Sequence, residues 1–142
     1  MSASSAPVVN ERDAIDALLV PVGDEWHSVR LDCVREVVIA GSVTDVPEPP
    51  IWLLGLVNLR GDVLPVIDSA RPLGLGDVGR RTHHVVVDTM VGLAALAATG
   101  APSSARLADG AGAGNVAGAA GRFVVDGSLT TLLDIDDLLG LR

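Results

Sequence analysis

The side chains best suited to chemistry are two adjacent histidines, which could act as metal ligands. His83 and His84 fall in a run that reads as a strand, where neighbouring side chains point to opposite faces, so the two cannot easily grip one ion. No Cys or Glu stands at ligand spacing from them, whereas a zinc site needs three or four convergent ligands. We therefore expect no metal site at this pair.

A second candidate for metal chemistry is the acidic cluster Asp134, Asp136 and Asp137. A calcium-binding loop needs a Gly at its sixth position and a bidentate acid at its twelfth, and neither follows these residues. The better interpretation is that Asp136 is the N-cap of a terminal helical turn.

Enzyme motifs are equally weak. Gly112 and Gly114 match part of the glycine pattern of dinucleotide sites, but that pattern works only between a strand and a helix, which the surrounding Ala and Gly do not predict. The phosphate-binding GxxxxGK[ST] motif and the GxSxG motif of serine hydrolases are both absent from the sequence. We expect no catalytic residue, no cofactor and no enzymatic activity, because no nucleophile is paired with a base.

The composition indicates which partners are excluded. The formal net charge is −8, and such an acidic chain repels nucleic acid and anionic membrane surfaces. Cys33 is the only cysteine, so no internal disulfide can form, and a free thiol fits a reducing cytoplasm. The apolar stretch 85–99 is interrupted by Asp88 and is too short to span a bilayer comfortably. We expect a soluble, cytoplasmic protein.

The elements that must position any site are short strands joined by Gly and Pro turns. We expect a disordered tail at 1–12 and one domain over 13–142. The predicted strands are 17–22, 25–31, 53–59, 63–68, 80–89 and both arms of a hairpin in 122–136. The other predictions are a short helix at 31–38, a proline-rich connector at 46–52, a loop over most of 100–121 and either strand or helix at 91–98. Seven or eight short strands with few helices indicate a mainly β barrel or sandwich.

The block WLLGLVNLRGDVLPVIDSARPLGL at 52–75 carries the most specific pattern. Two apolar arms flank a turn in which Gly61 is free to take a positive φ. The block closely resembles the central hairpin of CheW-like domains, where a GxxNLRGxxxPxxD pattern recurs. The matching positions are Gly55, Asn58, Leu59, Arg60, Gly61, Pro65 and Asp68. Upstream, Val34 and Glu36 fit the V-x-E pattern of the family, and the resemblance covers roughly residues 15–140.

The resemblance to the CheW-like family implies a fold of two small five-stranded SH3-like β-barrels that share a hydrophobic core. It implies a non-catalytic adaptor that couples the regulatory domain of a CheA-type histidine kinase to the cytoplasmic tip of methyl-accepting chemoreceptors. Small residues in 92–121 stand where relatives usually carry branched ones. Because Ala and Gly bury little area, we predict that part of the second barrel is reduced or mobile.

Three residues are carried over from the family as protein-binding candidates: Arg60, Glu36 and Val34. Arg60 stands at a hairpin tip, where its guanidinium should project into solvent and bind a partner's carboxylate or carbonyl; a solvated turn residue is the alternative. On the predicted helix, Glu36 faces away from the apolar side, whereas Val34 fits core packing as well as partner contact. Asn58 is expected to be buried and to satisfy backbone groups, and Asp68 to cap the following turn.

Two other functions fit the same sequence. A CheW-like adaptor can serve a different two-component pathway that controls motility, development or gene expression. The chain can instead be a small-molecule-binding β-barrel, with the ligand in the groove between the two barrels. An adaptor should present an apolar, non-concave patch rimmed by charge, and a ligand binder an enclosed pocket with a few converging polar groups.

Overall fold

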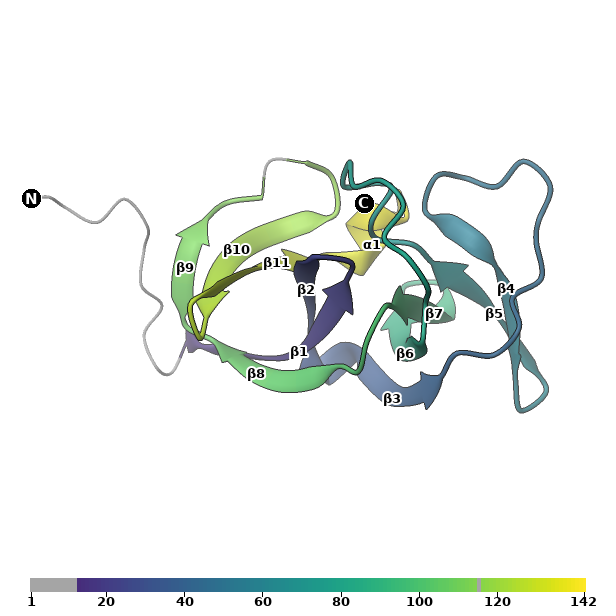
Figure 1. Ribbon diagram of the computed structural model, residues 1–142, viewed down its shortest axis with the longest axis horizontal. Coiled ribbons are helices and arrows are strands. Elements are labelled where there is room, and N and C mark those ends of the chain that lie inside the picture. The colour runs from purple at the N-terminus through teal and green to yellow at the C-terminus, as the bar shows by residue number, and fades with distance from the viewer. Residues whose placement is uncertain (1–12, 115) are drawn as a thin grey trace, which may run out of the picture.

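Two curled β-sheets make up most of the computed structural model, which describes residues 13–114 and 116–142 (Figure 1). The expected tail at 1–12 lies outside the described residues. The six strands of the first sheet are β1 (Ile15–Val22), β2 (Glu25–Arg30), β8 (Ser103–Leu107), β9 (Asp109–Gly112), β10 (Ala119–Val125) and β11 (Ser128–Leu133). The five strands of the second are β3 (Val34–Ile39), β4 (Leu53–Leu59), β5 (Asp62–Ile67), β6 (His83–Thr89) and β7 (Gly92–Ala98).

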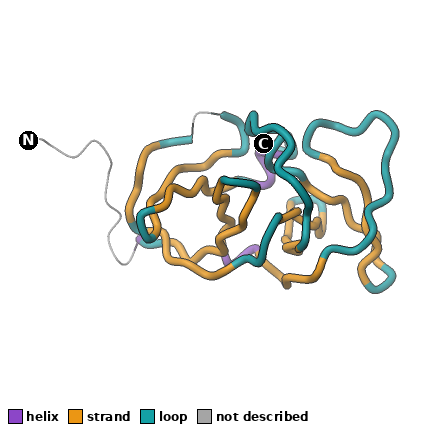
Figure 2. The backbone as a smooth tube through the Cα atoms, viewed as in Figure 1, coloured by secondary structure: helices purple, strands orange, loops and turns teal. Residues whose placement is uncertain are grey.

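The strand order explains how each sheet curls (Figure 2). The first sheet runs β8-β1-β2-β11-β10-β9 and the second β3-β6-β7-β5-β4. Each sheet has one parallel pair, β2 with β11 and β5 with β7, among antiparallel neighbours. The mainly β class is confirmed, although the first sheet has six strands where five were expected. Among the described residues, no helix is long and apolar enough to cross a membrane.

A shared hydrophobic core lies between the two sheets. Val20 of the first sheet and Val85 and Val87 of the second belong to one buried cluster. Successive side chains on a strand alternate between faces, so Val86 points the other way, into a cluster inside the second sheet. A third cluster, which includes Phe123, lies inside the first sheet. Burial on both faces explains why the middle of β6 consists of three consecutive valines.

The predicted helix at 31–38 is wrong. The chain makes one 3-10 turn over Leu31–Cys33 and then enters β3. Most residues of β3 are β-branched, and the strand pairs antiparallel with β6. A short apolar run fits both the helical and the strand period, and pairing with β6 decides between them.

The predicted loop over 100–121 is also wrong for much of its length. β8 pairs with β1, and β9 pairs with β10, so this part of the first sheet is present. Leu107 is fully buried and anchors the end of β8. The small residues of this segment bury little area, but their backbone groups are paired with neighbouring strands. The ambiguous segment at 91–98 is strand β7.

The turn of the β4–β5 hairpin has the conformation that the sequence predicts. Arg60 has φ 50° and Gly61 has φ 91°, as in a two-residue hairpin turn with both residues left-handed. The side chain of Asn58 accepts the Gly61 N–H at 2.9 Å, although Asn58 is exposed and not buried as expected. The parallel pairing of β5 with β7 starts at Val66, directly after Pro65, which has no N–H to donate.

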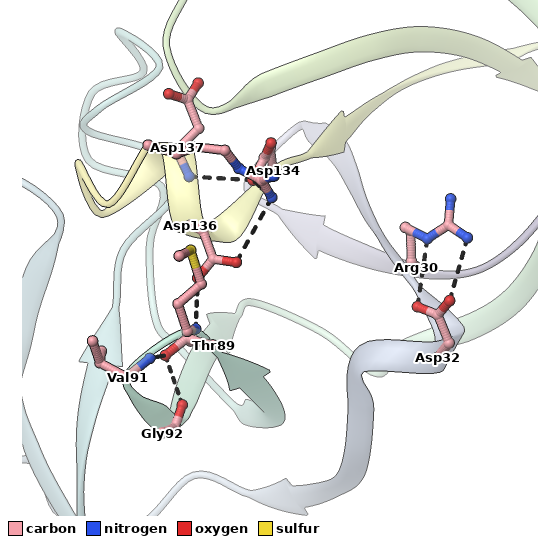
Figure 3. A network of polar contacts seen from close by, with 10 residues as sticks. Arg30, Asp32, Thr89, Val91, Gly92, Asp134, Asp136 and Asp137 are labelled. Atoms are coloured by element: carbon pink, nitrogen blue, oxygen red, sulfur yellow. Dashed lines mark hydrogen bonds and ion pairs between the residues drawn. The ribbon is translucent and has the colours of Figure 1, made fainter.

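The acidic cluster at the C-terminal end holds the helix α1 (Ile135–Leu138) in place (Figure 3). The N-cap is Asp134, whose side chain accepts the Asp137 N–H at 3.2 Å, and the prediction of Asp136 as the cap is wrong. The helix begins earlier than expected, so Asp136 lies within its first turn. Its carboxylate accepts the backbone N–H of Met90 at 2.8 Å, which ties the helix to the turn between β6 and β7.

Candidate protein-interaction surface

Arg60 and Glu36 form an ion pair on the surface of the second sheet. Glu36 lies on the edge strand β3 and Arg60 at the tip of the β4–β5 hairpin, and Arg60 Nη2 donates to Glu36 Oε2. The left-handed turn determines the direction in which the Arg60 side chain leaves the backbone, and strand β3 positions the Glu36 carboxylate. The pair stays accessible, since 66% of the Arg60 side chain and 36% of the Glu36 side chain are exposed.

This pairing corrects one prediction about Arg60. The side chain is exposed as expected, but its guanidinium is not free, because Glu36 occupies one of its nitrogens. The hydrogen bond and charge of Glu36 raise the pKa of the Arg60 guanidinium, so the group stays charged. A guanidinium has five N–H donors, and within the described chain this hydrogen bond engages Nη2 alone. Donors remain for a carboxylate of another molecule.

Val34 is not brought to this ion pair. The register between β3 and β6 shifts between Val34 and Glu36, so Val34 stands opposite Val87 and Glu36 opposite Val86. Such a bulge re-aims the side chains on either side of it. Val34 is half-buried and packs against the shared core. Core packing is therefore shown for Val34, and contact with a partner stays a prediction.

An open apolar groove beside the hairpin was not found from the sequence. Its volume is about 450 Å³, and β5, β7 and the C-terminal segment form its walls. Three aliphatic side chains at the groove are well exposed: Val63 at 62%, Val91 at 77% and Leu93 at 39%. The one available signal in the sequence was the apolar residue Val91 in a hairpin turn, where polar residues are usual. We call Val63, Val91 and Leu93 the apolar patch.

The buried polar residues His27, Asp68 and Ser69 have a structural role. His27 Nδ1 lies 2.7 Å from Ser69 Oγ, and both residues are buried. Burial lowers the pKa of His27 to about 4, against the opposing effect of the Asp68 carboxylate. Asp68 accepts the Ala70 N–H at 2.9 Å, which confirms its predicted turn cap, and lies 3.5 Å from Arg81. Ser69 is 1% exposed, so a substrate cannot reach its hydroxyl.

The described residues also offer no arrangement of metal ligands. His83 and His84 point to opposite faces, as predicted, with His84 buried and His83 half-buried. No group of three or more His, Cys, Asp or Glu side chains in 13–114 and 116–142 is placed to hold a metal ion. What the surface does present is an exposed ion pair and an exposed apolar patch, which are features that protein–protein interfaces commonly contain.

Comparison with known families identifies the domain. A family model of the CheW-like domain matches residues 16–142. The chain belongs to the CheW-like domain family. The matched range contains both sheets from β2 to β11, the hairpin with Arg60 and the strand with Glu36. The resemblance drawn from residues 52–75 is therefore confirmed.

Individual relatives of this CheW-like chain match over about half of their length. A probable chemotaxis protein CheW of Rhizobium etli is 37% identical over 70 residues, which are 49% of this chain and 45% of that protein. Protein FrzA of Myxococcus xanthus is 38% identical over 85 residues, covering 51% of this chain and 53% of FrzA. The crystal structure of the scaffolding protein TtCheW from Thermoanaerobacter tengcongensis aligns with a TM-score of 0.71 at 22% identity, over 84% of this chain and 88% of that one. The last comparison shows the CheW fold.

Proposed function

We propose that this CheW-like chain is a non-catalytic adaptor in bacterial chemosensory signalling. It couples the regulatory domain of a CheA-type histidine kinase to the cytoplasmic tip of methyl-accepting chemoreceptors, and it works in the cytoplasm. The family match over residues 16–142 and the relatives named as chemotaxis proteins support this. The net charge of −8 argues against direct binding to nucleic acid or anionic membranes.

The observation that carries the proposal is the exposed ion pair between Arg60 and Glu36. A partner carboxylate can take the place of Glu36 on the planar guanidinium, which binds carboxylates in a fixed geometry. The exchange replaces one charged contact with another, so it fixes orientation and excludes wrong partners more than it adds affinity. Micromolar, exchangeable binding of this kind suits a protein that must hold two partners.

The apolar patch favours an adaptor over a small-molecule binder. Val63, Val91 and Leu93 lie around an open groove, and the polar side chains of Asp62 and Thr89 also line it. A small-molecule site instead encloses its ligand and aims several polar groups at one point. An exposed apolar surface with polar residues beside it is typical of protein–protein contacts.

Isothermal titration calorimetry tests the proposal, with the regulatory domain of a CheA-type kinase encoded near this chain's gene. We expect micromolar binding by the unchanged protein. Binding should be weaker by at least about tenfold for Arg60→Ala, because the carboxylates of Glu36 and of the partner would then face each other with no cation between them. Arg60→Lys should recover only part of the affinity, since an ammonium cannot form the planar fork. Arg30→Ala is the matched control, because Arg30 ends β2 of the first sheet, is 56% exposed and pairs with Asp32 of the following 3-10 turn.

Each outcome of this titration has a distinct meaning. Thermal melting of Arg60→Ala should be close to that of the unchanged protein, because exposed side chains contribute little packing. If neither the kinase domain nor a receptor-tip fragment binds the unchanged protein, the adaptor function is wrong. If both bind and Arg60→Ala binds as tightly as Arg30→Ala, the hairpin tip lies outside the interface.

A further inference from the structure

A polar cleft lies between the first sheet and the loop that follows β5 of the second. Its volume is about 180 Å³, and β2, β10 and β11 contribute to its wall. The loop after β5 contributes Leu73 and Leu75. Neither the apolar patch nor the ion pair of Arg60 and Glu36 lines this cleft. Small-molecule sites are often found at such boundaries between packed units.

Three polar side chains of the cleft lie in a row across neighbouring strands (Figure 1). His27 of β2 stands opposite Thr131 of β11, and Thr131 stands opposite Arg122 of β10. Residues opposite each other in a sheet project from the same face, and all three line the cleft. Neighbouring strands are about 4.8 Å apart, so the row spans about 10 Å, which the long Arg122 side chain can cross.

The imidazole of His27 turns one nitrogen toward the cleft. The residue is 2% exposed, and its Nδ1 lies 2.7 Å from the Ser69 hydroxyl. Nε2 has no partner among the described residues, yet none of their fully buried side-chain nitrogens or oxygens lacks one. Nε2 must therefore touch open space, which the cleft provides. Burial lowers the pKa of His27 to about 4, so the ring is neutral at pH 7, and a Ser69 hydroxyl that donates to Nδ1 leaves the ring proton on Nε2.

Arg122 brings a positive charge without a counter-charge of its own. The residue is half-buried, and in the part of the chain that the structure describes its guanidinium has neither an ion pair nor a hydrogen bond. Glu25 is the one acidic residue that lines the cleft, and it is exposed and does not pair with Arg122. A guanidinium binds carboxylates through two parallel hydrogen bonds, so the unused fork of Arg122 is suited to an anionic oxygen group.

From these observations we propose that the cleft binds a carboxylate on a short aliphatic stem. Arg122 pairs with the carboxylate, and the Thr131 hydroxyl and the Nε2–H of His27 donate to its oxygens, which together accept up to about four hydrogen bonds. The stem packs against Leu73 and Leu75. An apolar cavity of about 150 Å³ holds benzene, so a molecule with as many heavy atoms, such as butyrate, fits this volume. The site does not rest on the proposed adaptor function.

NMR titrations of the isotopically labelled chain at constant ionic strength test the site. Butyrate should shift the His27 ring and the Arg122 guanidinium signals, with a dissociation constant on the order of 1 mM for so small a ligand. Butyramide has the same shape without the charge and should bind at least about tenfold more weakly. Acetyl-Gly-Glu-Gly-amide is the second carboxylate probe. If it binds at least as tightly as butyrate, the ligand is a glutamate of another protein; if butyrate alone binds, the ligand is a free small acid.

Three variants test the named groups. Arg122→Ala should weaken butyrate binding at least about tenfold, because the charged contact is lost. Arg106→Ala is the matched control, because Arg106 lies on β8 of the same sheet, is 50% exposed and does not line the cleft. Thr131→Val keeps the side-chain shape and should weaken binding about threefold or more through the lost hydroxyl. Glu25→Gln should tighten binding about twofold, because a like charge is removed.

Several results would overturn the inference. They are the absence of shifts with both carboxylate probes at concentrations about tenfold above the expected dissociation constant, equal binding of butyrate and butyramide, or equal binding by Arg122→Ala and Arg106→Ala. Weaker butyrate binding by Glu25→Gln would also contradict an anion site. If Arg122→Ala does not fold, the comparison of butyrate with butyramide on the unchanged protein decides alone. Failure of the kinase titration leaves each of these readouts interpretable.

Discussion

Gly55 gives the sharpest test of how the hairpin motif holds the second sheet together. The residue is buried in β4 and has φ 155°, and a Cβ built on it would lie 2.3 Å from the carbonyl oxygen of Thr44. That Cβ would also lie 2.6 Å from Cγ1 of Val43. Atoms cannot approach so closely, so in Gly55→Ala the segment around Thr44 must move away from β4.

The cost of this movement follows from the contacts that it breaks. The Thr44 carbonyl accepts the Leu56 N–H, and the Thr44 N–H donates to the Leu56 carbonyl. Each of these hydrogen bonds contributes about 1 kcal/mol, and an added methyl group in a packed site costs about 1–3 kcal/mol. We expect Gly55→Ala to lower the free energy of unfolding by about 3–5 kcal/mol, which is a large share of the stability of a small domain.

Urea denaturation followed by circular dichroism measures this change. Gly76→Ala is the control, because a Cβ at Gly76 meets nothing within 4 Å and its backbone is not left-handed. That variant should be more stable than the unchanged protein by about 0.4–1 kcal/mol, since alanine restricts the unfolded chain. If Gly55→Ala lowers the free energy of unfolding by less than about 1 kcal/mol, the segment around Thr44 moves away from β4 easily, and its close approach to Gly55 does not constrain the fold.

Two further outcomes follow from buried groups and from strand pairing. The pKa of His27 is lowered from 6.5 to about 4, so the unfolded chain binds this proton at higher pH than the folded one, and stability should fall as the pH drops from 6.5 toward 4. In urea denaturation, the free energy of unfolding should be about 2 kcal/mol lower at pH 5 than at pH 7.5, and this difference should be smaller in His27→Asn. In hydrogen exchange, amides of Ser103–Leu107 paired with β1 should be protected, whereas equal protection at 116–118 would contradict the assignment of a turn there.

The parts of the fold that the sequence predicts are those with local turn and alternation signals. Asn58, Arg60 and Gly61 supply a complete two-residue turn, so the hairpin follows from a few adjacent residues. The opposite faces of His83 and His84 follow from the strand period alone. In contrast, β8 and β9 consist largely of small or polar residues, and only pairing with distant strands makes them strands.

The site was less predictable than the fold because its groups come from distant parts of the chain. Glu36 and Arg60 are 24 residues apart, and only the curl of the second sheet brings the carboxylate to the hairpin tip. The family resemblance identified both residues. Their contact could not be predicted, because Glu36 was assigned to a helix at 31–38 and not to strand β3. The bulge that turns Val34 toward the core has no local sequence signal that we can identify.

The ion pair has a consequence for how a partner can bind. In the free protein Glu36 already neutralises Arg60, so a partner gains only the difference between its own contact and the one it replaces. A displaced Glu36 is not left buried, because 36% of its side chain is exposed and water can solvate it. The exchange is therefore nearly balanced, and most of the net affinity must come from apolar burial elsewhere. The apolar patch is a described surface that can provide it. Under the proposed adaptor function, we therefore predict that the charged tip determines which partner fits, while Val63, Val91 and Leu93 determine how tightly it is held.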